Sequence, residues 1–284
     1  MDFSFHLLLA CSTTASSPSG SSLQIAAQTA IAGAFVAVLA ALIFIRRLRK
    51  PASFAAYVVV AGLTALLVPA VRDAQRAARR SSCDCNLKQI GLALQNYADV
   101  YKSFPPAYVT DARGTRMHSW RVLILPFMEQ KPLYEMYDFN EPWNGPHNRR
   151  LANMMPPIYR CPSDDLARRG ETSYAAIDGP GTVFSGSKGS TFTDIKDGTS
   201  NTVAVVEAAG AGIDWMEPRD LPFSSLRGGV MSSMKTGVAS RHVGTCMAVF
   251  CDGHTYGLPS TTPVRTLQAL FTRAGGEATG DLRQ

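Results

Sequence analysis

The sequence predicts an α+β fold, in which a long N-terminal membrane helix continues as a stalk packed on a small antiparallel sheet and is preceded by an extra transmembrane helix. Three observations predict it. Residues 1–71 of the 284 hold only five charged side chains, although 18% of the whole chain is charged. A helical stripe of apolar residues follows. Short strand-like runs then alternate with connections rich in Gly and Pro.

The net charge of +6 is concentrated near the predicted membrane boundaries. Residues 1–71 contribute +3 and residues 72–80 contribute another +3, so the rest of the chain is neutral overall. Basic residues in these places suit lipid headgroups, whereas a nucleic-acid-binding domain carries its excess charge on the folded part. We therefore expect membrane lipid as a partner and no nucleic acid.

Residues 1–24 form a Ser-rich tail that contains no Lys or Arg. Residues 8–11 resemble the cleavage box of a lipoprotein signal, but the tail lacks a basic start and a full apolar region. An uncleaved tail is therefore favoured, and lipidation of Cys11 is the alternative.

Two apolar segments predict two membrane spans. Residues 25–45 contain only two polar members and are long enough, at 1.5 Å per residue, to cross a hydrocarbon core of about 30 Å. Residues 46–51 form a basic loop, and residues 52–71 form the second span. The absence of Lys and Arg from the tail favours a cytoplasmic position for this loop. The chain is thus expected in the cytoplasmic (inner) membrane, with its large C-terminal domain outside the cytoplasm.

Residues 72–104 predict an amphipathic stalk helix, because apolar residues recur there at spacings of three and four. The stripe consists of Leu87, Ile90, Leu94, Tyr97 and Tyr101. Pro105 and Pro106 end the pattern. The second span and the stalk therefore form one helix from about Ala52 to Ser103, with a bend expected at Pro69.

Residues 105–284 predict an extracytoplasmic α+β domain. Helices are expected at residues 120–128, 133–137, 147–153 and 262–273, and strands at residues 172–177, 201–207 and 244–251. Asp252 and Gly253 lie between two apolar runs, which is a strong hairpin signal.

Ordered motifs from Leu66 to the end are similar to those of one bacterial family. They lie at residues 66–80, 86–97, 119–126, 141–143, 159–163, 194–201 and 206–208. They close with His242, nine residues, and Asp252-Gly253. The chain resembles the planctomycete-type pilin-like family of unknown function that is named for this His-x9-Asp-Gly motif. Its layout resembles type IV pilins and the pseudopilins of type II secretion, which implies pilin-like or secretion-system subunits as partners.

The N-terminus departs from that family. Its members usually begin with a Gly-Phe cleavage site before the hydrophobic helix and a Glu five residues into the mature chain. No Gly-Phe occurs near Ala52, and an extra span stands in its place. The resemblance thus implies a pilin-like domain, but not processing by a prepilin peptidase or assembly into a filament.

The cysteines predict a structural role outside the cytoplasm. A disulfide from either Cys83 or Cys85 to Cys161 would tie the stalk to a loop. Cys246 and Cys251 are five apart on one predicted strand, so they point to opposite faces and cannot pair. A zinc site is the alternative, but no Cys-x2-Cys pair supports it.

Asp194, Asp197, Ser200 and Asn201 gather oxygen ligands around a turn, which is what a calcium ion requires. The spacing is not that of an EF-hand. Asp-Gly and Ser-Asn also form ordinary turns through bonds from side chain to backbone. The turn is the favoured interpretation, so we expect no cofactor, with calcium as the alternative.

His242 and Asp252 suggest an acid/base pair, with Ser200 as a nucleophile. The chain has no Gly-x-Ser-x-Gly elbow, and a His and an Asp beside a hairpin more often hold the hairpin. Aromatic residues that would line a glycan or peptide surface are more often core. They are Trp120, Trp143, Trp215, Tyr101, Tyr134, Tyr137 and Tyr159.

These observations favour a non-enzymatic function. We expect a membrane-anchored, pilin- or pseudopilin-like structural or interaction protein in a secretion or cell-surface assembly. The alternative is an envelope enzyme or a solute- or glycan-binding module that uses His242, Asp252 and the loop 194–201.

Overall fold

The computed structural model describes residues 52–231 and 237–277, with side chains from residue 61 onward except residue 66. The predicted tail 1–24, the first predicted span 25–45 and the basic loop 46–51 lie outside the described residues. Contacts divide the chain into two units, residues 1–79 and 80–284, and each is described by itself.

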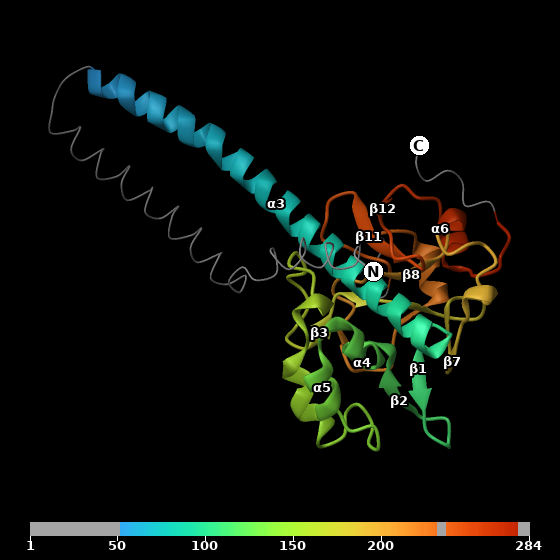
Figure 1. Cartoon of the computed structure of the whole chain (residues 1–284). Coiled ribbons are helices and arrows are strands. Elements are labelled where there is room, and N and C mark those ends of the chain that lie inside the picture. The colour runs from blue at the N-terminus through green and yellow to red at the C-terminus, as the bar shows by residue number, and fades with distance from the viewer. Residues whose placement is uncertain (1–51, 232–236, 278–284) are drawn as a thin grey trace. The chain divides into compact units, whose positions relative to one another are not determined.

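Helix α3 runs without a break from Ala52 to Tyr101 (Figure 1). The sequence predicted one helix from about Ala52 to Ser103, and this prediction is confirmed to within two residues. Pro69 lies inside the helix and removes one backbone hydrogen bond without ending it. Lys102 follows with φ 61°, the left-handed conformation that commonly ends a helix.

The part of α3 in the first unit is exposed at every described side chain from residue 61 to residue 79. Its large apolar side chains are 47–60% exposed. They are Leu63, Leu67, Val68 and Val71. Across the residues described in full, no helix has the length and apolar character needed to cross a membrane.

The part of α3 in the second unit packs on the α+β domain. Leu87, Ile90 and Leu94 of the predicted stripe are buried. The prediction was wrong at Tyr101, which is exposed. Tyr101 is the last helical residue, and its ring covers Tyr97 at 4.4 Å between centroids instead of entering the core.

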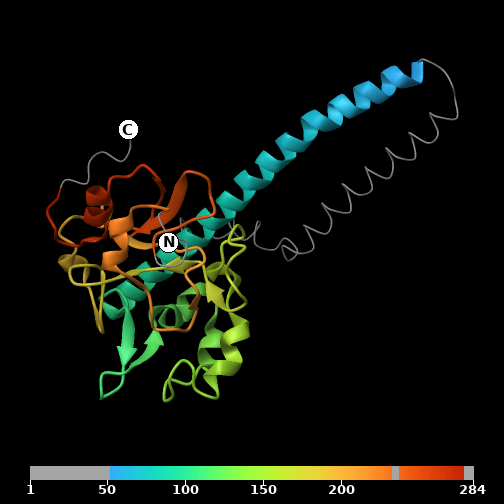
Figure 2. The ribbon, with the colours of Figure 1, turned by 180° about the vertical axis from the view of Figure 1, so that it is seen from behind.

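The central sheet of the domain has four antiparallel strands in the order β12-β11-β8-β4. Figure 2 shows the orange strands of this region from behind. Their bounds are β4 (Tyr174–Ala175), β8 (Val203–Glu207), β11 (Thr245–Phe250) and β12 (Thr255–Pro259). The long central pair, β8 and β11, is buried along its whole length. Such strands have an apolar layer on each face.

Side chains of β8 and β11 alternate between two hydrophobic clusters. Val205 and Val249 join the cluster that contains the stripe of α3. Val206 and Ala248 join the cluster that contains the buried face of α6 (Val264–Phe271). The sheet therefore lies between α3 on one face and α6 on the other.

The predicted hairpin is confirmed, with Asp252 and Gly253 in the turn between β11 and β12. Gly253 has φ 86°, and a Cβ there would lie 3.2 Å from the Gln95 side chain, so the turn requires glycine. Cys246 and Cys251 are both free thiols and belong to opposite clusters, as the strand alternation predicted.

The other sheets are small. One pairs β1 (Tyr108–Thr110) with β2 (Arg116–Ser119), and another pairs β3 (Glu171–Thr172) with β9 (Ile213–Asp214). A four-stranded sheet has the order β10-β5-β6-β7, with bounds β5 (Ile177–Asp178), β6 (Phe184–Ser185), β7 (Lys188–Gly189) and β10 (Leu221–Pro222). Its pairs β10–β5 and β5–β6 are parallel, so not every sheet is antiparallel as predicted.

The strand predicted at residues 172–177 is divided into β3, β4 and β5, which belong to three different sheets. The residues between these strands are bonded elsewhere. The Ser173 N–H donates to the Tyr159 carbonyl at 2.9 Å, and the Ala176 N–H donates to the Asp220 carboxylate at 2.8 Å. Neither N–H group is therefore available to form the hydrogen bonds of one continuous β-strand.

Short helices occupy the predicted helical regions. The predicted helix 120–128 is two elements, α4 (Trp120–Leu123) and the 3-10 helix η1 (Leu125–Met128), because Pro126 cannot donate to an α-helical ladder. The predicted helices 133–137 and 147–153 correspond to α5 (Lys131–Met136) and η2 (Asn148–Met154). Three further 3-10 helices were not predicted, namely η3 (Pro157–Tyr159), η4 (Phe192–Asp194) and η5 (Phe223–Gly228).

Candidate functional site

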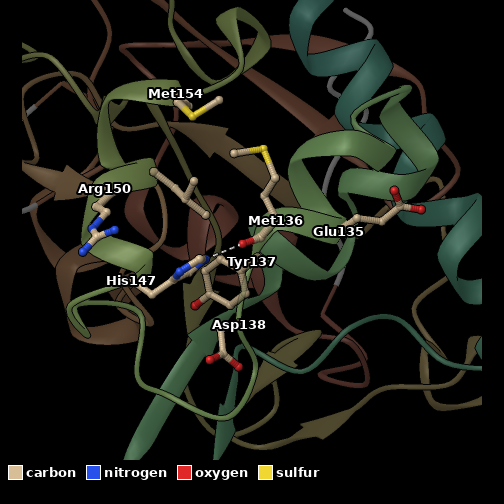
Figure 3. Close-up of a pocket in the computed structure, with 8 residues that line it drawn as sticks. Glu135, Met136, Tyr137, Asp138, His147, Arg150 and Met154 are labelled. Carbon is tan, nitrogen blue, oxygen red and sulfur yellow. Dashed lines mark hydrogen bonds between the residues drawn. The ribbon is translucent and has the colours of Figure 1, made fainter.

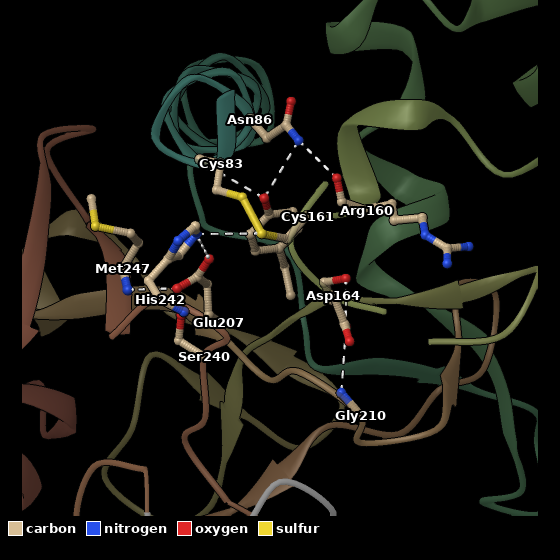
Figure 4. Close-up of a disulfide and its surroundings, with 12 residues drawn as sticks. Cys83, Asn86, Arg160, Cys161, Asp164, Glu207, Gly210, Ser240, His242 and Met247 are labelled. Atoms are coloured by element: carbon tan, nitrogen blue, oxygen red, sulfur yellow. Dashed lines mark hydrogen bonds and ion pairs between the residues drawn. A yellow bond between two sulfur atoms is a disulfide. The ribbon is translucent and has the colours of Figure 1, made fainter. Parts of the chain in front are cut away.

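Four side chains that bind metals or protons in many proteins converge in the core of the second unit. Cys83 comes from α3, Cys161 from the loop after η3, Glu207 from the end of β8, and His242 from the loop before β11 (Figure 4). One sulfur, nitrogen or oxygen atom of each lies within 4.8 Å of the others. All four side chains are buried. We call this group the disulfide cluster.

Cys83 and Cys161 form a disulfide across a sequence separation of 78 residues. Their Cα atoms are 5.2 Å apart. The sequence left two pairings open, and the structure forms the one with Cys83 rather than Cys85. The bond links α3 to the loop after η3, so it fixes the stalk on the domain as the sequence analysis expected.

His242 lies against both the disulfide and the carboxylate. Its Nε2 is 3.5 Å from the Cys161 Sγ and 3.4 Å from the Glu207 Oε1. The His242 backbone N–H donates to the Ser240 Oγ at 3.0 Å, which holds the loop before β11 in place. The imidazole is 7% exposed and thus has almost no contact with water.

Glu207 is a charged residue at the end of an otherwise apolar strand, and it is 1% exposed. Its Oε2 accepts the Met247 N–H at 2.8 Å, whereas its Oε1 has no hydrogen-bond partner. The Cys246 Sγ donates to the Glu207 carbonyl at 3.5 Å. Burial, followed by the Glu207 carboxylate, raises the pKa of the Cys246 thiol, so that this thiol stays protonated.

The loop that carries Cys161 is fixed by a buried carboxylate. Asp164 accepts the Ser173 hydroxyl at 2.8 Å and the Gly210 N–H at 3.3 Å. On the other side, the Asn86 Nδ2 of α3 donates to the Arg160 carbonyl at 2.9 Å. The loop that carries Cys161 is therefore bonded on each side to a different part of the domain.

His242 and Asp252 do not meet. Each lies beyond one end of β11, and a strand of this length separates its ends by roughly 17–20 Å. The Asp252 Oδ1 instead lies 2.6 Å from the Nδ1 of His254. The structure thus corrects the expectation that His242 and Asp252 hold the hairpin together. His254 takes that place, and His242 belongs to the disulfide cluster.

The loop 194–201 uses its polar atoms for local structure. The Asp194 carboxylate accepts the Thr191 N–H at 2.8 Å, and this bond lowers its pKa. The Asp197 carboxylate accepts the N–H groups of Gly275 and Gly276 at 2.7 and 2.9 Å.

The other two residues of this loop complete the turn. The Asn201 Nδ2 donates to the Asp197 carbonyl at 2.9 Å, and Ser200 is exposed. Asp252 lies beside this loop, since its N–H donates to the Thr199 carbonyl at 3.3 Å. With these bonds, the loop 194–201 forms a turn that is joined to the residues after α6.

The aromatic residues divide between core and surface. Trp120, Trp215 and Tyr159 are completely buried, as the core interpretation predicted. The Trp120 Nε1 donates to Asp220 at 3.0 Å and the Tyr159 hydroxyl donates to the Arg121 carbonyl at 2.7 Å, so their polar atoms are satisfied inside the domain.

A surface pocket of about 590 Å³ lies between α5 and η2, away from every residue singled out as a catalytic or metal-binding candidate in the sequence (Figure 3). The His147 Nε2 there lies 2.8 Å from the Met136 carbonyl. The pocket is lined by Glu135, Met136, Tyr137, Asp138, His147, Arg150, Leu151 and Met154.

Sequence reasoning missed Glu207 and the buried pair of Arg121 and Asp220. The signal for Glu207 was present, because it is the one charge in the run from Val203 to Gly210. Arg121 lies in an apolar run from Trp120 to Leu125, which was read only as a helix.

Comparison with known proteins gives one match. Residues 72–221, more than half of the chain, match the family described as "Protein of unknown function (DUF1559)". The matched segment includes Cys83, Cys161 and Glu207 and ends before His242. Neither the curated proteins nor the solved structures contain a significant match. The chain therefore belongs to the DUF1559 family of proteins of unknown function.

Proposed function

We propose that this protein is a membrane-anchored, pilin- or pseudopilin-like structural or interaction protein. Its α+β domain lies outside the cytoplasm and takes part in a secretion or cell-surface assembly. The observation that carries the proposal is the change in burial along α3. Described side chains are exposed up to residue 81, and from Cys83 onward every third or fourth residue is buried in the domain.

The exposed apolar side chains of α3 would be more stable in contact with an apolar environment, which the described residues do not provide. Burying a Leu or Val side chain contributes about 1.5–3 kcal/mol relative to leaving it in water. Leu63, Leu67, Val68 and Val71 lie within a stretch without charge that ends at Arg72. Lipid is the covering that best fits a segment of this kind, since charges return where the segment would leave the bilayer.

The partners we propose follow from the difference between the exposed part of α3 and the part that packs on the domain. Membrane lipid surrounds the uncharged segments 25–45 and 52–71, and pilin-like or secretion-system subunits contact the domain or the stalk. The neutral domain gives no support to nucleic-acid binding. Neither catalysis nor a cofactor is part of this proposed function.

Topology and processing test the proposal together. The full chain is expressed with a C-terminal reporter that is active only outside the cytoplasm, and its mature N-terminus is determined by mass spectrometry. We expect an active reporter, a retained Met1, and a chain that stays in the membrane fraction after alkaline carbonate washing. An inactive reporter, or release of the chain by carbonate, would contradict the proposal.

Two lysine substitutions on α3 form a matched pair. Leu63→Lys places a charge in the proposed span, at a cost of up to about 3 kcal/mol near the centre of a membrane helix. Val100→Lys changes a side chain of similar exposure, 61% against 56%, in the part of α3 that packs on the domain. We expect Leu63→Lys alone to reduce membrane retention. Equal retention of both variants would argue against lipid as the covering.

A further inference from the structure

We propose that Cys83, Cys161, Glu207 and His242 bind a zinc ion when the disulfide between Cys83 and Cys161 is reduced. The disulfide cluster would then exist in two forms, one closed by a bond between sulfurs and the other closed by a metal. This inference does not depend on the proposed membrane function, because it concerns only residues in the core of the second unit.

The donor set is the one that zinc prefers. Two cysteine thiolates, one histidine nitrogen and one carboxylate oxygen give four ligands, and zinc in structural sites is bound by four such groups in a tetrahedron. The four residues come from α3, the loop after η3, β8 and the loop before β11. A metal at this point would hold together α3 and the loop after η3, which the disulfide now joins, and would add β8 and the loop before β11.

Two of the distances between donor atoms already match those of a tetrahedral site. With bonds of about 2.0–2.3 Å from zinc to its ligands, adjacent donor atoms lie about 3.3–3.8 Å apart. The His242 Nε2 is 3.5 Å from the Cys161 Sγ and 3.4 Å from the Glu207 Oε1. All four donor atoms lie within 4.8 Å of one another. The two sulfurs are bonded to each other and must separate after reduction, so side-chain rotations at Cys83 and Cys161 would complete the geometry.

Glu207 supplies an independent indication of a ligand. Its Oε1 is buried and has no hydrogen-bond partner, and the His242 Nε2, at 3.4 Å, pairs with it only when the imidazole is protonated. A buried polar atom without a partner costs about 1–3 kcal/mol, and a bound cation would remove this cost. The other oxygen accepts the Met247 N–H at 2.8 Å, which orients the carboxylate in the way that outer hydrogen bonds orient metal ligands.

Conversion of the disulfide form into the zinc form requires a reductant, and a dithiol supplies the electrons and protons that are needed. The reductant transfers two electrons and two protons to the Cys83–Cys161 bond and becomes a disulfide itself. The two thiols formed then bind Zn²⁺ as thiolates and release two protons to water. Glu207 binds as a carboxylate and His242 as a neutral imidazole, so neither needs another reactant.

Cobalt substitution tests the proposal, because Co²⁺ replaces Zn²⁺ in such sites and absorbs visible light. The full chain in detergent is reduced without oxygen by a phosphine, which is then removed, and is titrated with Co²⁺. We expect one Co²⁺ per chain, with the intense visible bands of tetrahedral cobalt and a thiolate charge-transfer band in the near ultraviolet. Zn²⁺ should displace it, and the oxidised chain should show no such bands.

Variants separate the proposed ligands from other buried groups. Cys83→Ser should abolish the charge-transfer spectrum, and Glu207→Gln and His242→Asn should each weaken Co²⁺ binding at least tenfold. Cys251→Ser and His254→Asn are the controls, since they change a buried thiol and a histidine outside the disulfide cluster. Both controls should bind like the parent chain.

Circular dichroism and thermal unfolding of the reduced chain complete the test. If the metal-free reduced chain loses structure, Zn²⁺ should restore it, and failure to do so would overturn the proposal. A folded reduced chain without tetrahedral cobalt bands would overturn it as well. So would undiminished binding in Cys83→Ser and His242→Asn.

Discussion

Arg121 and Asp220, 99 residues apart in sequence, form an ion pair that is closed to water. The Arg121 Nη2 lies 2.6 Å from the Asp220 Oδ1, and the two side chains are 0% and 1% exposed. The guanidinium also donates to the Tyr174 carbonyl and the Ser119 hydroxyl, so α4 is bonded to β4 and to the residue that precedes β10. Breaking such a pair leaves a buried charge without compensation.

We expect Arg121→Met to lower the free energy of unfolding by about 3–5 kcal/mol at neutral pH. Burial already raises the pKa of Asp220 to about 6, and Arg121 is the largest influence that lowers it. Without Arg121 the pKa rises further, and a carboxyl with a raised pKa is protonated at low pH at little cost. The loss should therefore be larger at pH 8 than at pH 5, as measured by urea unfolding.

The matched control for this pair is Lys131→Met. Lys131 and Glu135 lie 3.7 Å apart and are 74% and 65% exposed, so their removal should cost less than about 1 kcal/mol. Equal effects of the two substitutions would show that the buried pair has no special role in stability.

Replacing both Cys83 and Cys161 with Ala should reduce the free energy of unfolding by about 3–5 kcal/mol in metal-free, non-reducing buffer. The disulfide closes a loop of 78 residues and so lowers the conformational entropy of the unfolded chain. Its removal restores this entropy and thereby favours the unfolded state. Cys251→Ala is the control, because it removes a buried sulfur that forms no disulfide. A double variant as stable as this control would contradict the expectation.

Gly91→Ala should destabilise the domain, although alanine is the better helix former by about 1 kcal/mol. An added Cβ would lie 2.5 Å from the Val249 Cγ2 and 3.3 Å from the Gly253 Cα, where α3 packs on the hairpin of β11 and β12. Overpacking of this kind costs about 1–3 kcal/mol.

Gly62→Ala provides the comparison on the same helix, since a Cβ there meets nothing within 4 Å. It should leave stability unchanged or raise it slightly. Urea unfolding of both variants measures the difference, and a Gly91→Ala chain as stable as the parent would show that the hairpin can move away from α3.

The stability of the domain should fall below pH 6.5 in a way that depends on His118. Burial lowers the pKa of this imidazole from its ordinary value of 6.5, although the Phe139 carbonyl and Asp138 oppose the shift. The unfolded chain then binds more protons than the folded one, so stability is full above pH 6.5 and is lost as pH falls toward the lowered pKa. One proton accounts for at most about 1.4 kcal/mol per pH unit.

His118→Gln should remove this part of the pH dependence between pH 7 and pH 5. Thermal unfolding of parent and variant across that range checks it. His254→Asn is the control, because His254 is half-buried at the surface, where it pairs with Asp252. Parallel curves for parent and His118→Gln would rule out His118 as the titrating group.

Local patterns in the sequence were sufficient for the long elements. The stripe from Leu87 to Leu94 predicted the buried face of α3, and Asp252-Gly253 predicted the hairpin, because both depend on residues close in sequence. The strand at residues 172–177 was predicted wrongly. Its division depends on bonds from Ser173 and Ala176 to residues that are distant along the chain, and no local pattern records them.

The candidate site was less accessible from the sequence for the same reason. The pairing of Cys83 or Cys85 with Cys161 was expected, but the approach of Glu207 and His242 to that bond depends on how four separate segments pack. The short interval between His242 and Asp252 suggested a common site. A strand between them places them at opposite ends, so closeness in sequence was misleading here.

The position of the Cys83–Cys161 bond has a mechanical consequence. It lies at the first buried residue of α3 in the domain, two residues beyond Ser81, where the exposed part of the helix ends. A tensile force transmitted down α3 would reach this covalent link before it reached the packed side chains at Leu87, Ile90 and Leu94. The helix therefore cannot be peeled from the sheet residue by residue, and the load is shared with the loop after η3.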